Sequence, residues 1–175
     1  REPREDLLSG LVAAEEAGDR LSSKELFGIC VLLLLAGNET TTNLIGNGTL
    51  ALLRHPEQYE LLRKEQERIP AAVEEMLRFD SPVQLTSRIV MEESSLRGRS
   101  FERGDQVVLV LAAGNRDPER FREPDRFDVT REDVKPLSFG YGAHHCLGAQ
   151  LARLEARAVF EGLTRRYTSL RPGAG

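Results

Sequence analysis

The sequence of 175 residues lacks tryptophan, has only two cysteines and carries no excess of positive charge. Cys30 and Cys146 do not have the paired spacing of a zinc site, and they do not suggest a disulfide framework. A net charge of -4 gives no reason to expect nucleic-acid binding. The longest apolar run, residues 29–36, falls far short of the roughly 20 residues that span a bilayer, and no signal peptide is visible. These absences predict a cytoplasmic protein with no membrane or nucleic-acid partner.

A capping box opens the longest predicted helix. Ser22 and Glu25 are three residues apart, so each side chain can accept a hydrogen bond from the other residue's backbone N–H. The helix is expected to run from residue 23 to about residue 54, where Pro56 stops it. Its first part is apolar on nearly every side, so we expect that part to be buried.

Shorter helices account for the rest of the first half. Leucine and valine at helical spacing predict a helix that begins at residue 7 and ends at Gly18. Pro56 and Pro70 each begin a further helix, and these two helices end near residues 68 and 79.

Beyond residue 80 the pattern changes. Segments 83–91 and 106–111 are rich in valine, leucine and threonine, which predicts strands, while the charged segment 116–133 predicts an ordered coil. A last helix follows Cys146, and its apolar stripe is formed by Leu147, Leu151, Leu154 and Ala158. We expect a mainly α fold with a small β component in one domain, residues 1–175, with helices over 1–80, small strands and coil over 81–135, and a loop and final helix over 136–175.

The segment AGNETTT, residues 36–42, interrupts the apolar character of the long helix. Glycine, asparagine and threonine are poor residues for a helix interior, and threonine hydroxyls can bond the carbonyl one turn back. One interpretation is a polar strip that faces solvent. The other is a loosened turn that makes room for a small ligand and offers hydroxyls and the Glu39 carboxylate for proton delivery.

The segment EEMLR offers a second choice. Glu75 and Arg78 are three residues apart and share a helix face, and Glu74 could serve Arg78 equally well. Most such pairs are exposed and contribute little to stability, so the residues alone favour an exposed pair.

The segment FGYGAHHCLG, residues 139–148, places a cysteine in a glycine-rich loop just before a helix. A thiolate is a soft metal ligand, and its charge is favoured at a helix N-terminus. The glycines would let the backbone pass close to a large flat group, Phe139 supplies an aromatic edge, and His144 could reach an anionic group on its rim. The pattern fits a haem held by Cys146.

Three motifs now occur together. F-G-x-G-x-H-x-C-x-G is filled at every fixed position of 139–148, A-G-x-E-T-T begins at Ala36, and E-x-x-R runs from Glu75 to Arg78, which favours Glu75 over Glu74. With these motifs the chain resembles a bacterial cytochrome P450, a haem-thiolate monooxygenase. The resemblance extends along essentially the whole chain, including TSRIV around residue 88 and the PDRF stretch at 124–127.

The resemblance implies the C-terminal haem-binding half of the cytochrome P450 fold, with haem b as cofactor and Cys146 as the axial ligand of the iron. Thr40 would hydrogen-bond dioxygen and its water, and Glu39 would help to relay protons. Arg88 and His144 would bind the haem propionates. The full set of residues implied to contact the haem is Ala36, Gly37, Arg88, Phe139, Gly140, His144 and Gly148.

The implied reaction inserts one oxygen atom of dioxygen into a small organic substrate, with electrons supplied by a donor protein such as a ferredoxin. Residues 83–86 would line the substrate side. Glu75, Arg78 and Arg126 would form a buried ion network that steadies the haem loop.

The resemblance covers only the C-terminal part of a typical member, and the first residue is not methionine, so we expect a truncated or processed chain. The apolar run 29–36 would then lack its cover, which predicts a homodimer with the long helix at or near the contact. Two other functions stay open: a non-catalytic or peroxidase-like haem-binding module, and a haem-free, self-associating interaction domain.

Overall fold

The computed structural model describes residues 4–16 and 21–173, so the predicted helix end at Gly18 lies outside the described residues. The chain divides into two units, residues 1–40 and 41–175. The boundary falls inside the long helix.

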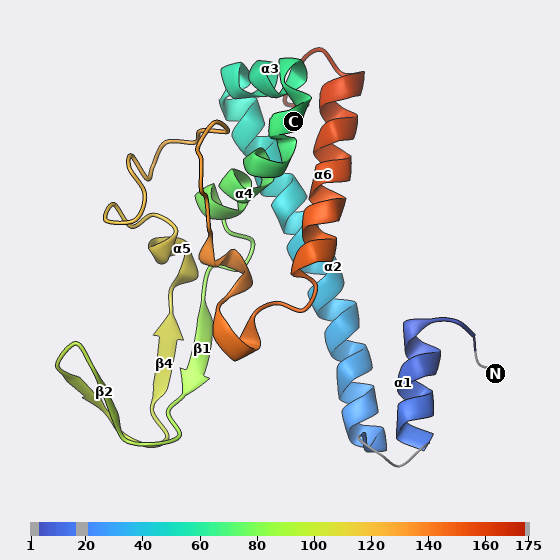
Figure 1. Ribbon diagram of the computed structural model, residues 1–175, viewed down its shortest axis with the longest axis vertical. Helices are drawn as coiled ribbons and strands as arrows, with labels where there is room; N and C mark the ends of the chain where they lie inside the picture. Colours follow the sequence, from blue (N-terminus) through green and yellow to red (C-terminus); the bar gives the residue numbers. More distant parts are fainter. Residues whose placement is uncertain (1–3, 17–20, 174–175) are drawn as a thin grey trace. The chain divides into compact units, whose positions relative to one another are not determined.

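The first unit holds α1, Leu7–Glu16, and the first part of α2, Ser23–Arg54 (Figure 1). The predicted capping box is confirmed. The Ser22 N–H donates to Glu25 Oε2 over 2.8 Å, and the Glu25 N–H donates to Ser22 Oγ over 3.3 Å. These two bonds satisfy backbone donors that the first turn of a helix leaves unpaired.

The predicted burial of the first part of α2 is wrong. Phe27 and Leu34 are 72% and 73% exposed, and Leu32 and Leu35 are also largely exposed. The hydropathy of this run favours burial against a packing partner, but the described residues do not supply one. By length and composition α2 would be apolar enough to cross a membrane, a test that the core helix of a soluble protein also passes.

The segment 36–42 continues as regular α-helix, so the loosened turn is not seen. The predicted back-bond is present, because the Thr40 hydroxyl donates to the Ala36 carbonyl over 2.8 Å. Thr49, nine residues further on, makes the same bond to the Ile45 carbonyl over 2.7 Å. Threonine at these positions is thus accommodated by bonding its own helix.

The second unit is built around the rest of α2 together with α3, Pro56–Lys64, the short 3-10 helix η1, Gln66–Arg68, α4, Ile69–Phe79, and α6, Ala149–Arg166. Both predicted helices are confirmed: α3 begins at Pro56, and α4 begins at Ile69, one residue before Pro70, with η1 between them. α4 packs against α6, and α3 also contacts α6 (Figure 1). The fully buried core of this unit includes Leu44, Leu52, Leu62, Ile69, Val73, Met76, Leu77 and Phe160.

A glycine sets how closely α2 approaches this core. A Cβ atom at Gly48 would lie 2.7 Å from Phe160 Cζ and 2.8 Å from Met76 Sδ. Such distances are shorter than side chains tolerate, so the absence of a side chain at residue 48 brings α4 and α6 onto α2.

The predicted apolar stripe of α6 does not face the core. Leu147 is 95% exposed, and Leu151 and Leu154 are also exposed, whereas Ala156 and Phe160 are fully buried. Helical spacing identifies apolar faces, and α6 has two of them. The structure packs the face that carries Ala149, Ala156 and Phe160 into the core.

Two small antiparallel sheets follow α4. β1, Thr86–Ile89, pairs with β4, Gln106–Leu109, in the register Thr86 to Leu109, which confirms both predicted strands. The hairpin of β2, Ser94–Leu96, and β3, Arg99–Phe101, was not predicted, because its two-residue turn is Arg97-Gly98 rather than a more typical Asn-Gly pair. The short helix α5, Leu111–Gly114, was also missed. Residues 116–133, all of them described, form no helix or strand, as the sequence predicts.

Candidate functional site

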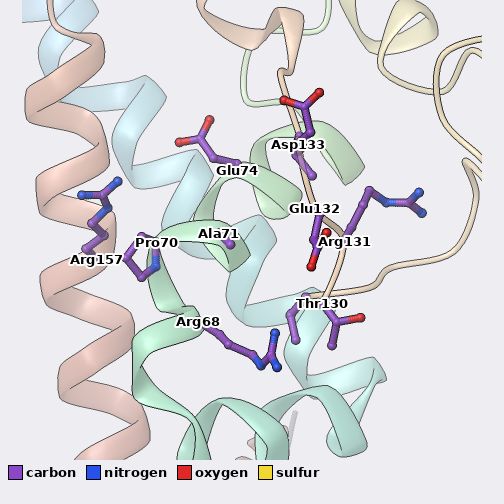
Figure 2. Close-up of a pocket in the computed structure, with 11 residues that line it drawn as sticks. Arg68, Pro70, Ala71, Glu74, Thr130, Arg131, Glu132, Asp133 and Arg157 are labelled. Carbon is purple, nitrogen blue, oxygen red and sulfur yellow. The ribbon is translucent and has the colours of Figure 1, made fainter.

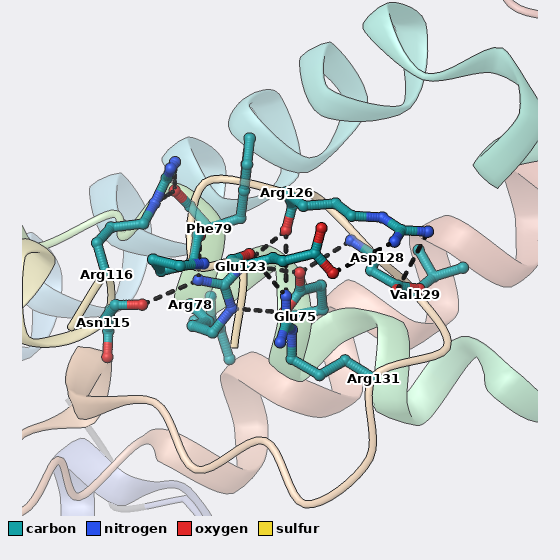
Figure 3. Close-up of polar contacts among 12 residues, drawn as sticks. Glu75, Arg78, Phe79, Asn115, Arg116, Glu123, Arg126, Asp128, Val129 and Arg131 are labelled. Atoms are coloured by element: carbon teal, nitrogen blue, oxygen red, sulfur yellow. Dashed lines mark hydrogen bonds and ion pairs between the residues drawn. The ribbon is translucent and has the colours of Figure 1, made fainter. Parts of the chain in front are cut away.

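The Glu75–Arg78 pair is completely buried (Figure 3). Arg78 Nε donates to Glu75 Oε2 over 2.6 Å, and Arg78 Nη2 donates to Glu75 Oε1 over 2.8 Å. This bidentate geometry confirms the choice of Glu75 over Glu74. The expectation of an exposed pair, drawn from the residues alone, is wrong, because α4 is covered on nearly every side.

The remaining N–H groups of Arg78 bind main-chain carbonyls. Nη1 donates to Asn115 O over 2.9 Å and to Pro124 O over 2.7 Å, and Nη2 donates to Arg126 O over 3.0 Å. All five guanidinium donors are therefore satisfied. Arg78 therefore connects α4 to residues 115–126 of the coil that follows α5.

The third charged member of the network differs from the one that the resemblance implies. The Arg126 side chain is 58% exposed, with Nη1 3.7 Å from Glu123 Oε2 and Nη2 3.8 Å from Asp128 Oδ2. Arg126 therefore binds the Glu75–Arg78 pair only through its main-chain carbonyl. Arg131 takes the place instead, with its Nε 3.3 Å from Glu75 Oε2 and a side chain that is only 14% exposed. No motif in the sequence marks Arg131.

Asp128 borders the same network. Its backbone N–H donates to Glu75 Oε1 over 2.9 Å, and its Oδ1 accepts bonds from the N–H and the hydroxyl of Thr130 over 2.9 and 2.6 Å. Burial by itself would raise the pKa of Asp128. The Thr130 hydrogen bonds and the nearby Arg126 and Arg131 charges outweigh burial and lower that pKa below its ordinary value.

The cysteine loop, residues 137–148, begins with one short 3-10 helix, contains a second and ends at α6. η2, Leu137–Phe139, is followed by η3, Gly142–His144, and Gly148 is the N-cap of α6. The Cys146 N–H donates to the Phe139 carbonyl over 2.8 Å and closes the loop on itself. Gly140 and Gly142 have φ values of 71° and 75°, which residues other than glycine rarely adopt.

The Cys146 thiol is free and exposed at the start of α6. A Cβ atom at Gly142 or Gly148 would meet no heavy atom within 4 Å, so the backbone there is open to a neighbouring group. The exposed soft donor, the glycines and the following helix N-terminus fit a haem-thiolate site.

The Phe139 ring packs against Arg153, which is paired with Glu74. The Arg153 guanidinium lies 4.5 Å from the centroid of the Phe139 ring, and its Nε donates to Glu74 Oε1 over 2.6 Å. Glu74 therefore has a partner of its own on α6, which explains why it does not compete for Arg78.

The other predicted haem contacts of this unit are exposed. Arg88, on β1, donates to Thr86 Oγ1 over 3.1 Å and to the Ser87 carbonyl over 2.8 Å. His144 is the last residue of η3, and its side chain is exposed. Both side chains are therefore accessible to a ligand.

The predicted distal residues all lie on one stretch of α2 in the first unit. Ala36, Gly37 and Glu39 are exposed, and Thr40 is partly buried. A Cβ atom at Gly37 would meet nothing within 4 Å. Cys146 belongs to the second unit.

A pocket of about 460 Å³ lies in the second unit, and none of the predicted site residues lines it (Figure 2). Its charged side chains are largely paired within the protein: Glu74 with Arg153, Arg131 with Glu75, Asp133 with Lys135, and Arg68 with Glu65. It is therefore distinct from the cysteine loop.

Comparison with known proteins defines the family. A profile described as "Cytochrome P450" matches residues 1–173. The chain is 54% identical over 160 residues to the vitamin D(3) 25-hydroxylase of Pseudonocardia autotrophica and covers 40% of that protein. It is 45% identical over 169 residues to the polyketide biosynthesis cytochrome P450 PksS of Bacillus subtilis and covers 42% of it.

Solved structures agree. The ligand-free CYP164A2 of Mycobacterium smegmatis superposes with a TM-score of 0.95 at 47% identity, over 100% of this chain and 45% of that one. P450BioI, in complex with a fatty-acyl-loaded acyl carrier protein, gives a TM-score of 0.92 at 46% identity. The fold is thus that of the haem-thiolate oxygenases. The chain belongs to the cytochrome P450 family, and it spans about two fifths of the length of the curated relatives it matches.

Proposed function

We propose that the chain is the haem-binding, C-terminal part of a cytochrome P450 monooxygenase that inserts one oxygen atom of dioxygen into a small organic substrate. The observation that carries this proposal is the exposed Cys146 thiol, presented by a loop of glycines at the N-terminus of α6. Family membership supports it, since relatives are named as hydroxylases and monooxygenases.

Cys146 would bind the iron of haem b. Phe139, Gly140 and Gly148 of the second unit and Ala36 and Gly37 of the first would contact the haem, and Arg88 and His144 would bind its propionates. A thiolate-bound haem supplies the electron density that favours O–O cleavage.

The protein groups with protons to give are on α2. The Thr40 hydroxyl donates to the Ala36 carbonyl, which also accepts a backbone hydrogen bond of the helix. The hydroxyl can therefore turn toward a bound ligand without leaving that carbonyl unpaired. The exposed Glu39 carboxylate lies one residue earlier and can exchange protons with water. Thr40 would hydrogen-bond dioxygen and its water, and Glu39 would help to relay protons to them.

A ferredoxin-type donor, a cytoplasmic location and a homodimer complete the proposal. The dimer is supported by the exposed apolar side chains of α2, which a second copy could cover. Light scattering on the 175-residue chain tests it. A monodisperse monomer at micromolar concentration would exclude the dimer without affecting the haem assignment.

Absorption spectroscopy tests the haem assignment. The purified chain, incubated with haem, reduced and exposed to carbon monoxide, should show a thiolate-type Soret band. Cys146→Ser should abolish this band, because a serine hydroxyl is a poor ligand for a soft site. Cys30→Ser, on α2, is the matched control and should keep it. A chain that stays colourless with haem would favour the haem-free interaction domain instead.

A further inference from the structure

We propose that Asn115 is the positioning residue that fixes the start of the cysteine loop against α4. The proposal rests on the proposed function for its meaning, since the loop would hold the haem iron, but its geometry is independent of any haem. Asn115 directly follows α5 and is fully buried.

The Asn115 side chain uses all its hydrogen-bonding groups. Nδ2 donates to Ser81 Oγ over 2.7 Å and to Ser138 Oγ over 3.0 Å, and Oδ1 accepts the Leu137 N–H over 2.7 Å. The amide thus reaches the loop at two successive residues, once through the main chain and once through a hydroxyl.

The direction of these bonds follows from the partners. Ser81 Oγ donates to the Leu77 carbonyl over 2.9 Å, and Ser138 Oγ donates to the same carbonyl over 2.6 Å. The two hydroxyl oxygens are also 3.2 Å apart, a contact in which either could be the donor. The Leu137 N–H can only donate, so Asn115 Oδ1 must face it and Nδ2 must face the two hydroxyls. Only an amide offers two donors and an acceptor in this arrangement, so neither aspartate nor alanine can replace it.

Asn115 also connects the loop to the buried ion pair. Its main-chain carbonyl accepts the bond from Arg78 Nη1 over 2.9 Å, as Figure 3 shows. The backbone of Asn115 is therefore bonded to the Glu75–Arg78 pair, and its side chain is bonded to the loop.

The constraint continues to the cysteine. Leu137 and Ser138 are the first two residues of η2, and Phe139, its last residue, accepts the Cys146 N–H over 2.8 Å. Residues 141–148 are all exposed, so the described contacts hold this loop mainly at its two ends. Asn115 fixes one end, and α6 fixes the other.

Hydrogen exchange on the haem-free chain tests this role. Asn115→Ala removes the acceptor of the Leu137 N–H and should accelerate exchange in the peptide 137–146 by about tenfold, the factor expected for one lost hydrogen bond. Alkylation of Cys146, measured in a Cys30→Ser background, should accelerate as well.

The matched control is Thr164→Val. Thr164 is a buried hydroxyl on α6 that donates to the Phe160 carbonyl over 2.8 Å and accepts from Gln66 over 2.9 Å, away from the loop. This variant should lose stability without selectively accelerating exchange in 137–146. If Asn115→Ala does not fold, Ser138→Ala removes one partner of the amide and should still accelerate exchange in this peptide.

Unchanged exchange in 137–146, in whichever of these two variants folds, would overturn the proposal. In haem-loaded protein, Asn115→Ala should also lower the thiolate fraction of the reduced carbon monoxide complex, which the control should not do. A chain that never binds haem would refute the proposed function, and the exchange result would still decide the role of Asn115.

Discussion

The two parts of α2 on either side of Thr40 differ sharply in burial, although they form one continuous helix. Before Thr40, Phe27 and Leu34 are 72% and 73% exposed; after it, Leu44 and Leu52 are each 1% exposed. Both parts are rich in leucine, so apolar content does not cause the difference.

The second part of α2 is buried because α4 and α6 pack against it. Gly48 lets Phe160 and Met76 approach the helix backbone, so α4 and α6 close over this part. Gly28 and Gly37 in the first part are just as small, yet a Cβ atom at either would meet nothing within 4 Å. Hydropathy therefore indicates that a surface requires packing partners, and a small residue promotes burial only where such a partner lies close.

The largest expected effect is on the second unit, from Glu75→Ala. The substitution would leave the buried Arg78 and Arg131 guanidinium groups without their carboxylate, at a cost of about 3–5 kcal/mol. This is a large share of the roughly 5–15 kcal/mol that stabilises a domain. Chemical denaturation should show the loss, and amides of 41–54 should become as unprotected as we expect those of 23–40 to be.

Glu60→Ala is the control for this substitution. Glu60 pairs with Arg63 and Lys64 at the surface of α3, so its removal should change stability little. Equal midpoints for Glu75→Ala and the wild type would show that the buried network contributes nothing net.

The second prediction compares one leucine from each part of α2. Leu52→Ala should cost about 2–5 kcal/mol, because it leaves a cavity in the core. Leu34→Ala should change the unfolding free energy by less than about 0.5 kcal/mol, as surface substitutions do. Chemical denaturation at low protein concentration measures the unfolding free energy of both variants. A large, concentration-dependent loss for Leu34→Ala would instead reveal that a second copy covers this face.

The sequence predicted the helices best. The limits of α2 agree with its capping box at Ser22 and the stop before Pro56, because these signals are local and act through backbone hydrogen bonding. The β2–β3 hairpin was missed because Arg97-Gly98 is a weak turn signal. Which face of α6 packs was mistaken, since Leu151 and Ala156 both lie on apolar faces and only the tertiary fold decides between them.

The candidate site was predictable only in part. Motif spacing identified Cys146 and the Glu75–Arg78 pair, and the structure confirms the pair. Arg131 and Asn115 are far from their partners in sequence, and nothing in their local residues signals a role. Their contacts depend on how the coil between α5 and η2 folds back onto α4.

The third prediction compares two glycines of α2. Gly48→Ala should destabilise the protein by about 1–3 kcal/mol, because the new methyl group would overlap Phe160 and Met76. Gly28→Ala meets nothing within 4 Å and should stabilise the helix by up to about 1 kcal/mol through its higher helix propensity. Thermal unfolding measures both. Destabilisation by Gly28→Ala would show that the first part of α2 has a close neighbour in solution.

The smallest expected effect concerns acid, with one carboxylate from each unit. Asp128 and Glu25 both have a pKa below the ordinary value: Thr130 bonds and arginine charges outweigh burial at Asp128, and the Ser22 N–H and hydroxyl lower the pKa of Glu25. A depressed folded-state pKa stabilises the protein above the unfolded-state value, and this stability is lost as pH falls through the folded-state pKa. Between neutral pH and about pH 3, wild-type protein should therefore lose more stability than Asp128→Asn, whose amide oxygen can still accept the Thr130 bonds. Glu25→Gln should flatten only the acid fraying of 23–40, measured by hydrogen exchange. If Asp128→Asn and the wild type lose stability in parallel, the low pKa of Asp128 does not stabilise the fold.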